Sequence, residues 1–326
     1  MAYFDRRSVK AAAVDSLQNA ACDPKKLIFI HTGVALILSL VMTVVDYLLN
    51  LQIDATGGLD GIGLRSFLST AQSVLMMAQL LVVPAWTFGY TFVCLRLANG
   101  EEATPAMLLT GFRSYWRILR LQLLQAAIYF AIAFVCVYPT NLIFMLLPWS
   151  APLQELMMQL MGGVEISDAA IIAVVDQISV PLVLTYLGVF LLLSLPFFYR
   201  YRMAPYILMS DPKKGALAAL RESRRITRGS RLDLLKLDLS FWWFYGLELL
   251  LMLLSYGNLL LPALGVALPL SREVSYFLFF GLYLVGQLAL DLWKMNEVSL
   301  TYVHVYDALR DPMNPKPQPD FFQQGW

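Results

Sequence analysis

Charge is scarce in this chain. Asp, Glu, Lys and Arg make up 14% of its 326 residues, whereas hydrophobic residues make up 59%. Soluble globular domains carry about 25% charged and about 45–50% apolar residues. A soluble protein of this length needs a more polar surface than these charges can cover. The composition therefore excludes an ordinary soluble protein and favours one that is embedded in a membrane.

Cysteines are few, and the common catalytic motifs are absent. The three cysteines, Cys22, Cys94 and Cys136, form no CxxC pair, so they predict neither a disulfide framework nor a zinc site. The two histidines, His31 and His304, stand far apart in the sequence with no metal-ligand spacing around them. No GxxxxGK[ST], HExxH, GxSxG or GxGxxG segment occurs. We therefore expect no metal and no cofactor, and an ATPase, a zinc protease or a serine hydrolase is disfavoured.

What the chain has instead is a series of six long apolar segments. A helix rises about 1.5 Å per residue, so about 20 apolar residues cross the hydrocarbon core of a bilayer. The segments predict an all-α polytopic membrane protein with six transmembrane helices in three hairpins, forming a single domain over residues 1–310 before a Pro-rich cytoplasmic tail, 311–326. The predicted spans lie near 27–50, 67–97, 117–147, 178–203, 237–262 and 274–296.

The basic residues lie almost entirely on one side of these spans. Of the 24 Lys and Arg residues, 22 fall before the first span, in the second-to-third and fourth-to-fifth connections, or at the C-terminal end. Only Arg65 and Arg272 fall in the outer connections. Membrane loops rich in Lys and Arg stay in the cytoplasm. The pattern therefore predicts that both termini are cytoplasmic.

A cytoplasmic amphipathic helix is predicted before each hairpin. The first covers 6–21, and Thr104-Pro105 and Asp211-Pro212 open the other two, because Thr or Asp suits an N-cap and Pro suits the first helical position. The third helix, 212–228, is predicted to end at Gly229. Its basic residues fall within an arc of about 120° on one face: Lys213, Lys214, Arg221, Arg224, Arg225 and Arg228.

This basic face predicts binding to anionic lipid headgroups, or to a protein partner, at the cytoplasmic surface. The alternative is a topology anchor whose basic face is simply solvated. Membrane lipids are thus the expected partners. The sequence does not decide whether the protein is a homo-oligomer. Nothing in the chain resembles a nucleic-acid recognition fold, so nucleic acid is not an expected partner.

One extended sequence pattern covers the same region. It reads Tyr206-Ile-Leu-x-x-Asp211-Pro-x-x-Gly215-Ala-Leu-x-Ala219-Leu-x-x-Ser223-Arg-x-Ile-Thr-x-Gly229, then Asp238-Leu-Ser-Phe-x-Trp243. This stretch resembles an uncharacterised family of bacterial multi-pass membrane proteins, a domain of unknown function. In layout the chain is more distantly similar to the membrane domain of some glycerophosphodiester phosphodiesterases. The resemblance implies a bacterial cytoplasmic membrane protein and supplies no catalytic residue.

Four polar residues stand out inside the predicted spans: Glu248, Gln287, Asp291 and Lys294. A charge within a membrane is costly, so such residues point to a functional site. Gln287, Asp291 and Lys294 recur at helical spacing and form one stripe. The functional reading is a polar or proton-linked path between spans five and six. The structural alternative is a protonated Glu248 bonded to an amide and Asp291 paired with Lys294. Asp46 and Arg65 further predict an outer ion pair.

Three functional classes remain open. The first is a membrane-organising or accessory protein that binds anionic lipid or a partner through the basic cytoplasmic face. The second is a small transporter or channel that uses the polar stripe. The third is an intramembrane lipid enzyme, for which the sequence identifies no nucleophile. We favour the first.

Overall fold

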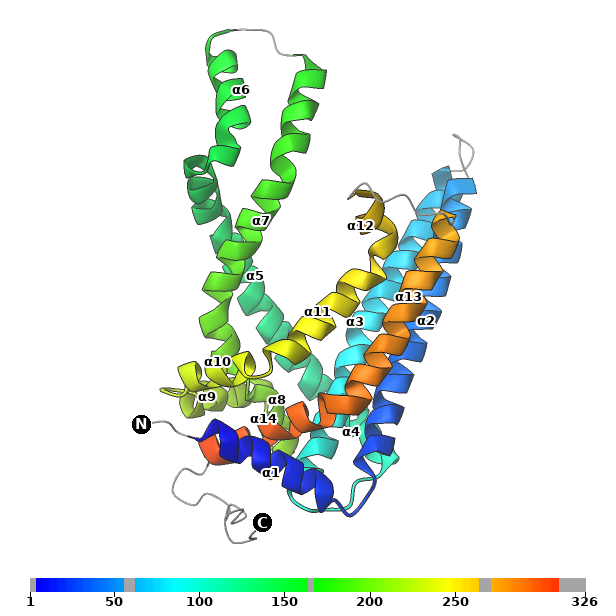
Figure 1. Ribbon diagram of the computed structural model, residues 1–326, viewed down its shortest axis with the longest axis vertical. Helices are drawn as coiled ribbons and strands as arrows, with labels where there is room; N and C mark the ends of the chain where they lie inside the picture. The colour runs from blue at the N-terminus through cyan, green and yellow to red at the C-terminus, as the bar shows by residue number, and fades with distance from the viewer. Residues whose placement is uncertain (1–3, 56–61, 164–166, 264–270, 311–326) are drawn as a thin grey trace. The chain divides into compact units, whose positions relative to one another are not determined.

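The computed structural model describes residues 4–55, 62–163, 167–263 and 271–310, and every regular element within these ranges is a helix (Figure 1). Five of these helices are long and apolar enough to cross a membrane, or six if the bent pair α10 (Arg231–Leu239) and α11 (Trp242–Ser255) is one span. The prediction of an all-helical chain whose helices suit a membrane is confirmed. The predicted Pro-rich tail, 311–326, lies outside the described residues.

By its contacts the chain divides into two compact units. Unit 1 combines Met1–Arg120 with Met203–Trp326, and unit 2 is Leu121–Arg202. Unit 2 holds most of α5 together with η3, α6 and α7. Ser167 caps the start of α7 by accepting a hydrogen bond from the Ala170 amide, and the Tyr186 hydroxyl joins α7 to α5 by donating to the Ala133 carbonyl at 3.0 Å. The bounds are α5 Tyr115–Leu146, η3 Pro148–Ser150, α6 Ala151–Met161 and α7 Asp168–Tyr201.

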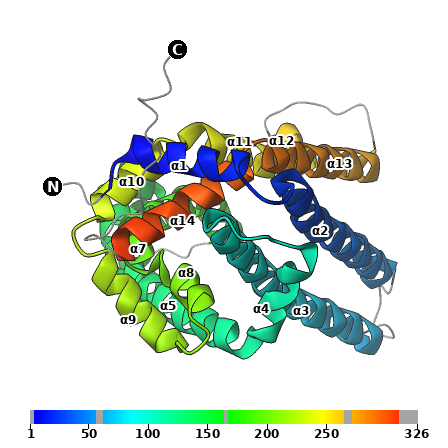
Figure 2. The ribbon, with the colours of Figure 1, turned by 90° about the horizontal axis from the view of Figure 1, so that it is seen from below.

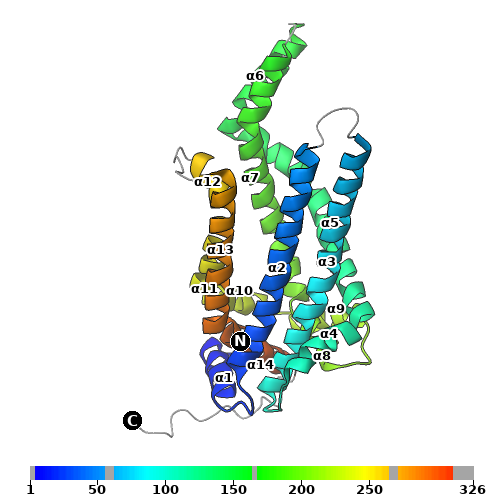
Figure 3. The same ribbon diagram turned by 90° about the vertical axis from the view of Figure 1, so that its right-hand side faces the viewer.

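The long helices of unit 1 stand side by side, with α2 packed on α3 and on α13, and α11 packed on α13 (Figure 3). Gly286 permits a close approach of α13 to α11, since a Cβ there would meet Leu251 Cδ2 at 2.4 Å. Large apolar side chains of these helices face outward; Phe67 is 69% exposed and Val285 70%. Such surface suits lipid rather than water. The bounds are α2 Pro24–Ala55, α3 Ile62–Ala98, α11 Trp242–Ser255, α12 Gly257–Ala263 and α13 Arg272–Leu290.

The best-packed part of unit 1 is the end at which its short helices gather (Figures 1 and 2). Leu108, Ile207, Leu300 and Tyr306 are fully buried there. The predicted helix before the first span is present as α1, which packs on α14. The predicted opening at Thr104-Pro105 is also present, as the N-cap and first residue of η2. The bounds are α1 Arg6–Gln18, η2 Pro105–Leu109, α4 Thr110–Arg113, α8 Ala204–Ser210, α9 Ala216–Ile226, α10 Arg231–Leu239, η4 Asp291–Met295 and α14 Asn296–Arg310.

The helix predicted over 212–228 is shorter than expected. The Asp211 carboxylate accepts a hydrogen bond from the Lys213 amide and forms a turn, so α9 begins only at Ala216. Asp therefore caps a turn here rather than a helix, because Asx side chains satisfy either structure. The helix ends at Ile226, and Gly229 follows with a φ of 94°, a left-handed conformation that favours glycine.

The segment predicted as a fifth span, near 237–262, is interrupted at two points. Helices α10 and α11 meet at Ser240 and Phe241 with a bend of 64°, and a second break at Tyr256 separates α11 from α12. Lys10 of α1 holds the first break, since its ammonium donates to the Ser240 carbonyl at 3.3 Å and lies 3.8 Å from the centre of the Phe241 ring. A residue distant in sequence thus stabilises the bend.

Helix α3 meets η2 and α4 through two glycines. A Cβ at Gly89 would lie 1.8 Å from the Leu108 carbonyl oxygen, and one at Gly111 would lie 1.8 Å from the Ala85 carbonyl oxygen. These contacts involve backbone, which cannot rotate away as a side chain can. The two glycines therefore set how closely the short helices approach α3.

We expect Gly89→Ala to lower the thermal stability of the purified protein in detergent. Overpacking of this kind costs about 1–3 kcal/mol. The matched control is Gly246→Ala, because no atom lies within 4 Å of a Cβ at that helical position. Alanine there should leave the melting temperature unchanged or raise it slightly, since Ala is the better helix former. Equal melting temperatures for the two variants would contradict the close-packing argument.

Candidate functional site

The structure divides the six basic residues predicted to share one helix face. Lys213 and Lys214 lie in the turn before α9, so only the four arginines belong to the surface of α9 and the turn after it. These four side chains are exposed, and we call them the arginine surface: Arg221, Arg224, Arg225 and Arg228.

The opposite face of α9 is buried, as its amphipathic pattern predicts. Ala219, Leu220 and Ser223 are at most 6% exposed and pack toward α8. Leu217, by contrast, is 56% exposed and stands on the outward side with the arginines. The outward side of α9 is therefore basic with one apolar residue, and the inward side anchors the helix.

Glu222 reduces the basic charge beside the arginine surface. Its carboxylate accepts a hydrogen bond from the Lys214 ammonium at 2.5 Å and lies 3.9 Å from Arg225. Lys214 is thus engaged within the protein, which separates it from the predicted binding face. Both side chains of the pair are partly buried, 26% and 18% exposed, and the pair removes one positive charge from the surface beside the arginines.

Arg117, at the start of α5, positions α9. Its Nη2 atom donates to the carbonyls of Leu208 at 2.7 Å and Asp211 at 2.8 Å, and its Nε atom donates to the Lys214 carbonyl at 3.2 Å. A planar guanidinium can satisfy several carbonyls in this way. Reasoning from sequence counted Arg117 only as a charge, because its partners are backbone atoms about 90 residues away.

Asp291 is the centre of the polar residues within the apolar helices. It lies in η4, a single π-helical turn between α13 and α14, and is 9% exposed. Its carboxylate accepts hydrogen bonds from the Thr32 hydroxyl of α2 at 2.8 Å and from the Gln287 amide at 3.0 Å. Single π-helical turns of this kind are frequent at functional sites.

The expected pair of Asp291 with Lys294 is wrong. Lys294 instead bonds Glu297 at 2.5 Å. The reason is the π-helical turn that contains both residues, because it holds about one residue more per turn and so changes the angle between Asp291 and Lys294 around the helix axis. The polar stripe of the last predicted span therefore faces α2 through Asp291, while Lys294 binds the acidic first turn of α14.

Glu248 lies on α11 and is half-buried. Its carboxyl group is close enough to that of Asp291 for their charges to interact, and the Tyr283 hydroxyl is a polar neighbour of both. The expected bond to a neighbouring amide is not found among the described residues. Glu248 and Asp291 are therefore electrostatic neighbours without direct contact.

A second polar group joins three helices near Asp291. The Tyr90 hydroxyl of α3 donates to Asn296 Oδ1 at 2.7 Å, and Asn296 Nδ2 donates to the Pro24 carbonyl at 2.9 Å. The His31 ring stacks on Tyr90 with centroids 4.4 Å apart, and Trp86 donates to the His31 carbonyl at 2.9 Å. Sequence reasoning weighed His31 as a metal ligand and missed Tyr90, Trp86 and Asn296; the signal was a set of aromatic and amide side chains near the inner ends of the spans.

His304, the other histidine, forms a hydrogen bond with Ser16 of α1 at 2.9 Å. The two histidines therefore have different contact partners. Within the described ranges no group of three or more His, Cys, Asp or Glu side chains is arranged to hold a metal ion. The cysteines are free, with Cys94 and Cys136 buried.

The last part of the sequence pattern, residues 238–243, lies at the bend between α10 and α11. The Tyr302 hydroxyl of α14 donates to the Asp238 carboxylate and lies 3.2 Å from the Tyr245 hydroxyl. Lys10 binds the same bend, and burial lowers the pKa of its ammonium below its usual range, an effect that Glu297 partly opposes. These residues hold α1, α10, α11 and α14 together.

Asp46, expected to pair with Arg65, has other partners. Its carboxylate accepts hydrogen bonds from the Gln72 amide of α3 and from the Asn50 amide at 3.3 Å. The Arg65 side chain lies outside the described residues. Asp46 lines a partly open pocket of about 460 Å³ between α2, α3, α11 and α13, which sequence reasoning did not anticipate.

We expect Arg117→Lys to loosen the connection between α8 and α9. A lysine offers one point charge and cannot reproduce the three carbonyl contacts, and hydrogen bonds to charged groups contribute about 1.5–3 kcal/mol. Hydrogen exchange should rise over residues 208–215. Arg120→Lys is the matched control, because Arg120 is exposed. Equal exchange in both variants would contradict the positioning role.

Comparison with known proteins identifies a family but no activity. No curated protein and no solved structure matches the chain. The family model for a protein of unknown function, DUF975, matches residues 5–284, which includes the arginine surface, Glu248 and every lining residue of the pocket. Because this match covers most of the chain, the protein belongs to the DUF975 family of proteins of unknown function.

Proposed function

We propose that this protein is a six-span integral membrane protein that binds anionic lipid headgroups, or an acidic partner, through the arginine surface of α9. In this proposal the bent pair α10–α11 supplies the fifth span, and the other five are the long apolar helices. The gathering of 22 basic residues on one side supports cytoplasmic termini. The likeness in layout to the membrane domain of some glycerophosphodiester phosphodiesterases stays a prediction and assigns no reaction.

The observation that carries the proposal is the orientation of α9. The helix buries its small and apolar residues and turns Arg221, Arg224, Arg225 and Arg228 outward, with Leu217 among them. Each basic residue near an anionic membrane surface contributes about 1 kcal/mol to attraction. An apolar residue on the same side suits the boundary between headgroups and acyl chains. A solvated anchor needs neither the shared orientation nor the exposed leucine.

We expect the variant with glutamine at all four arginines to lose selective binding of anionic lipid. The purified protein in a maltoside detergent is titrated with short-chain phosphatidylglycerol and, separately, with short-chain phosphatidylcholine. The wild type should bind the anionic lipid more tightly, and this preference should weaken as salt is added because the attraction is screened.

Two controls separate charge from folding in this experiment. Lysine at the same four positions keeps the charge and should retain most of the binding, whereas Glu248→Gln should leave it intact. If the glutamine variant binds phosphatidylglycerol as the wild type does, the proposal is wrong. If the wild type binds an acidic protein but shows no preference between the two lipids, the result favours an acidic protein partner.

A second candidate is a small transporter or channel, favoured by the contacts of Asp291. A buried carboxylate that bonds Thr32 and Gln287 and lies near Glu248 forms a polar path between α2, α11 and α13. Carboxyl groups in such positions relay protons in membrane pumps and transporters. The path continues toward Tyr283, which lines the pocket.

If the second candidate holds, proteoliposomes carrying this protein should dissipate an imposed pH gradient faster than empty liposomes, as followed by an internal pH-sensitive dye. Glu248→Gln should slow this flux, because an amide cannot carry the proton. Glu155→Gln removes an exposed carboxyl from α6 and serves as the matched control. Equal flux through wild-type and Glu248→Gln protein would argue against transport through this path.

A further inference from the structure

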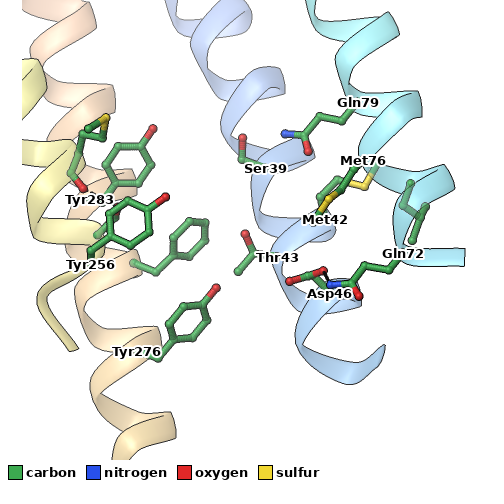
Figure 4. Close-up of a pocket in the computed structure, with 14 residues that line it drawn as sticks. Ser39, Met42, Thr43, Asp46, Gln72, Met76, Gln79, Tyr256, Tyr276 and Tyr283 are labelled. Atoms are coloured by element: carbon green, nitrogen blue, oxygen red, sulfur yellow. Dashed lines mark hydrogen bonds between the residues drawn. The ribbon is translucent and has the colours of Figure 1, made fainter. Parts of the chain in front are cut away.

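The pocket in unit 1 combines polar groups with aromatic rings inside an apolar helix bundle (Figure 4). The α2 side contributes Ser39, Thr43 and Asp46, whereas the side formed by α11 and α13 contributes tyrosines. Its volume of about 460 Å³ falls within the range of small-molecule sites, about 300–1,000 Å³. Lipid tails fill apolar gaps, so a polar pocket of this size indicates a polar occupant.

The charge of the pocket selects the sign of that occupant. Asp46 is its only carboxylate, and no Lys, Arg or His is among the described lining residues. The carboxylate receives hydrogen bonds from the neutral amides of Gln72 and Asn50. Neutral amides orient a carboxylate but do not balance its charge, and charges interact strongly where water is scarce. An anion is repelled from such a site, whereas a cation is attracted.

The aromatic wall favours an organic cation over a hydrated metal ion. Tyr276, Phe280 and Tyr283 recur at helical spacing on one face of α13, with ring centroids 6.4 Å and 6.0 Å apart in succession. Tyr256 adds a fourth ring from the end of α11. The faces of aromatic rings attract ammonium groups, and sites for quaternary ammonium ions are commonly built from several rings.

The tyrosine hydroxyls complete this chemistry. In Figure 4 the side chains of Tyr256, Tyr276 and Tyr283 extend toward α2, on which Thr43 and Asp46 lie. Among the described residues none of these three hydroxyls has a hydrogen-bond partner, although Tyr276 and Asp46 line the same pocket. Tyrosine hydroxyls in apolar surroundings usually have a partner. An occupant that carries hydroxyl or ammonium groups supplies one.

We propose that this pocket binds an organic ammonium group, held by the Asp46 carboxylate and enclosed by the rings of Tyr256, Tyr276, Phe280 and Tyr283. The group belongs either to a small soluble amine or to the headgroup of a phosphatidylethanolamine lipid, which share this chemistry. The site is independent of the arginine surface, which attracts the opposite charge.

The test compares two ligands of equal shape. Choline chloride and its neutral carbon isostere, 3,3-dimethyl-1-butanol, are titrated calorimetrically into the full chain in uncharged maltoside detergent. We expect choline to bind about tenfold or more tightly than the isostere, because only the ammonium gains from the carboxylate and the rings. Asp46→Asn should weaken choline binding by a similar factor, and Glu155→Gln on exposed α6 should not.

A second variant guards against misfolding of Asp46→Asn. Tyr276→Phe keeps the ring and removes one hydroxyl, so choline binding should weaken less than in Asp46→Asn while the preference over the isostere remains. Equal binding of choline and its isostere by the wild type overturns the proposal, and so does unchanged binding in folded Asp46→Asn.

The lipid source is separated by native mass spectrometry of protein extracted from membranes that contain phosphatidylethanolamine. Retention of this lipid by the wild type and its loss in Asp46→Asn identify the headgroup as the occupant. Choline binding without retained lipid identifies a soluble amine. Lipid retained equally by both proteins, together with no choline binding, overturns the proposal.

Discussion

The hydrogen bonds of Asn296 fix the register on which the polar interior of unit 1 depends. This side chain accepts from Tyr90 of α3 and donates to the carbonyl of Pro24, the first residue of α2. It is also the first residue after the π-helical turn. One amide therefore sets α2, α3 and the end of η4 at a common level. The contact between Asp291 and Thr32 requires that level, because a shift by one residue, about 1.5 Å along a helix, breaks a hydrogen bond of 2.8 Å.

This register matters because an unsatisfied polar group inside an apolar bundle is costly. Asp291 meets the cost with two neutral donors, and Asp46 meets it with two amides in the same way. Neither carboxylate has a basic partner among the described residues that contact it. Such an arrangement retains negative potential inside the bundle, whereas a salt bridge would cancel it. Both the candidate proton path and the ammonium pocket depend on that retained potential.

The sequence was sufficient for the features that depend on local pattern. Hydrophobic length predicted helices suited to a membrane, and 3.6-residue periodicity predicted which face of α9 is buried. Prediction from the sequence failed where contacts between residues distant in the chain determine the structure. Asp211 caps a turn because Arg117 binds the carbonyls around it, and the bend after α10 is held by Lys10. The prediction that Asp291 pairs with Lys294 assumed a regular α-helix, whereas both residues lie in the π-helical turn. No spacing rule reports such contacts.

The pocket and Asp291 belong to one continuous seam between α2 and α13. On α13, Tyr276, Tyr283, Gln287 and Asp291 fall within an arc of about 80° at 100° per residue. On α2, Thr32, Ser39, Thr43 and Asp46 fall within a similar arc of about 60°. The two helices run antiparallel in the chain. The Asp291–Thr32 hydrogen bond joins them at one end of the seam, and the stacked rings of Tyr47 and Tyr276, with centroids 6.5 Å apart, join them near the other end, where Asp46 and Tyr276 line the same pocket. Two polar stripes on neighbouring apolar helices, from Thr32 to Asp46 on α2 and from Tyr276 to Asp291 on α13 and the turn after it, exceed what packing alone requires. The seam thus makes the α2–α13 interface, rather than the α11–α13 interface alone, the part of this fold in which a membrane-embedded function is to be sought.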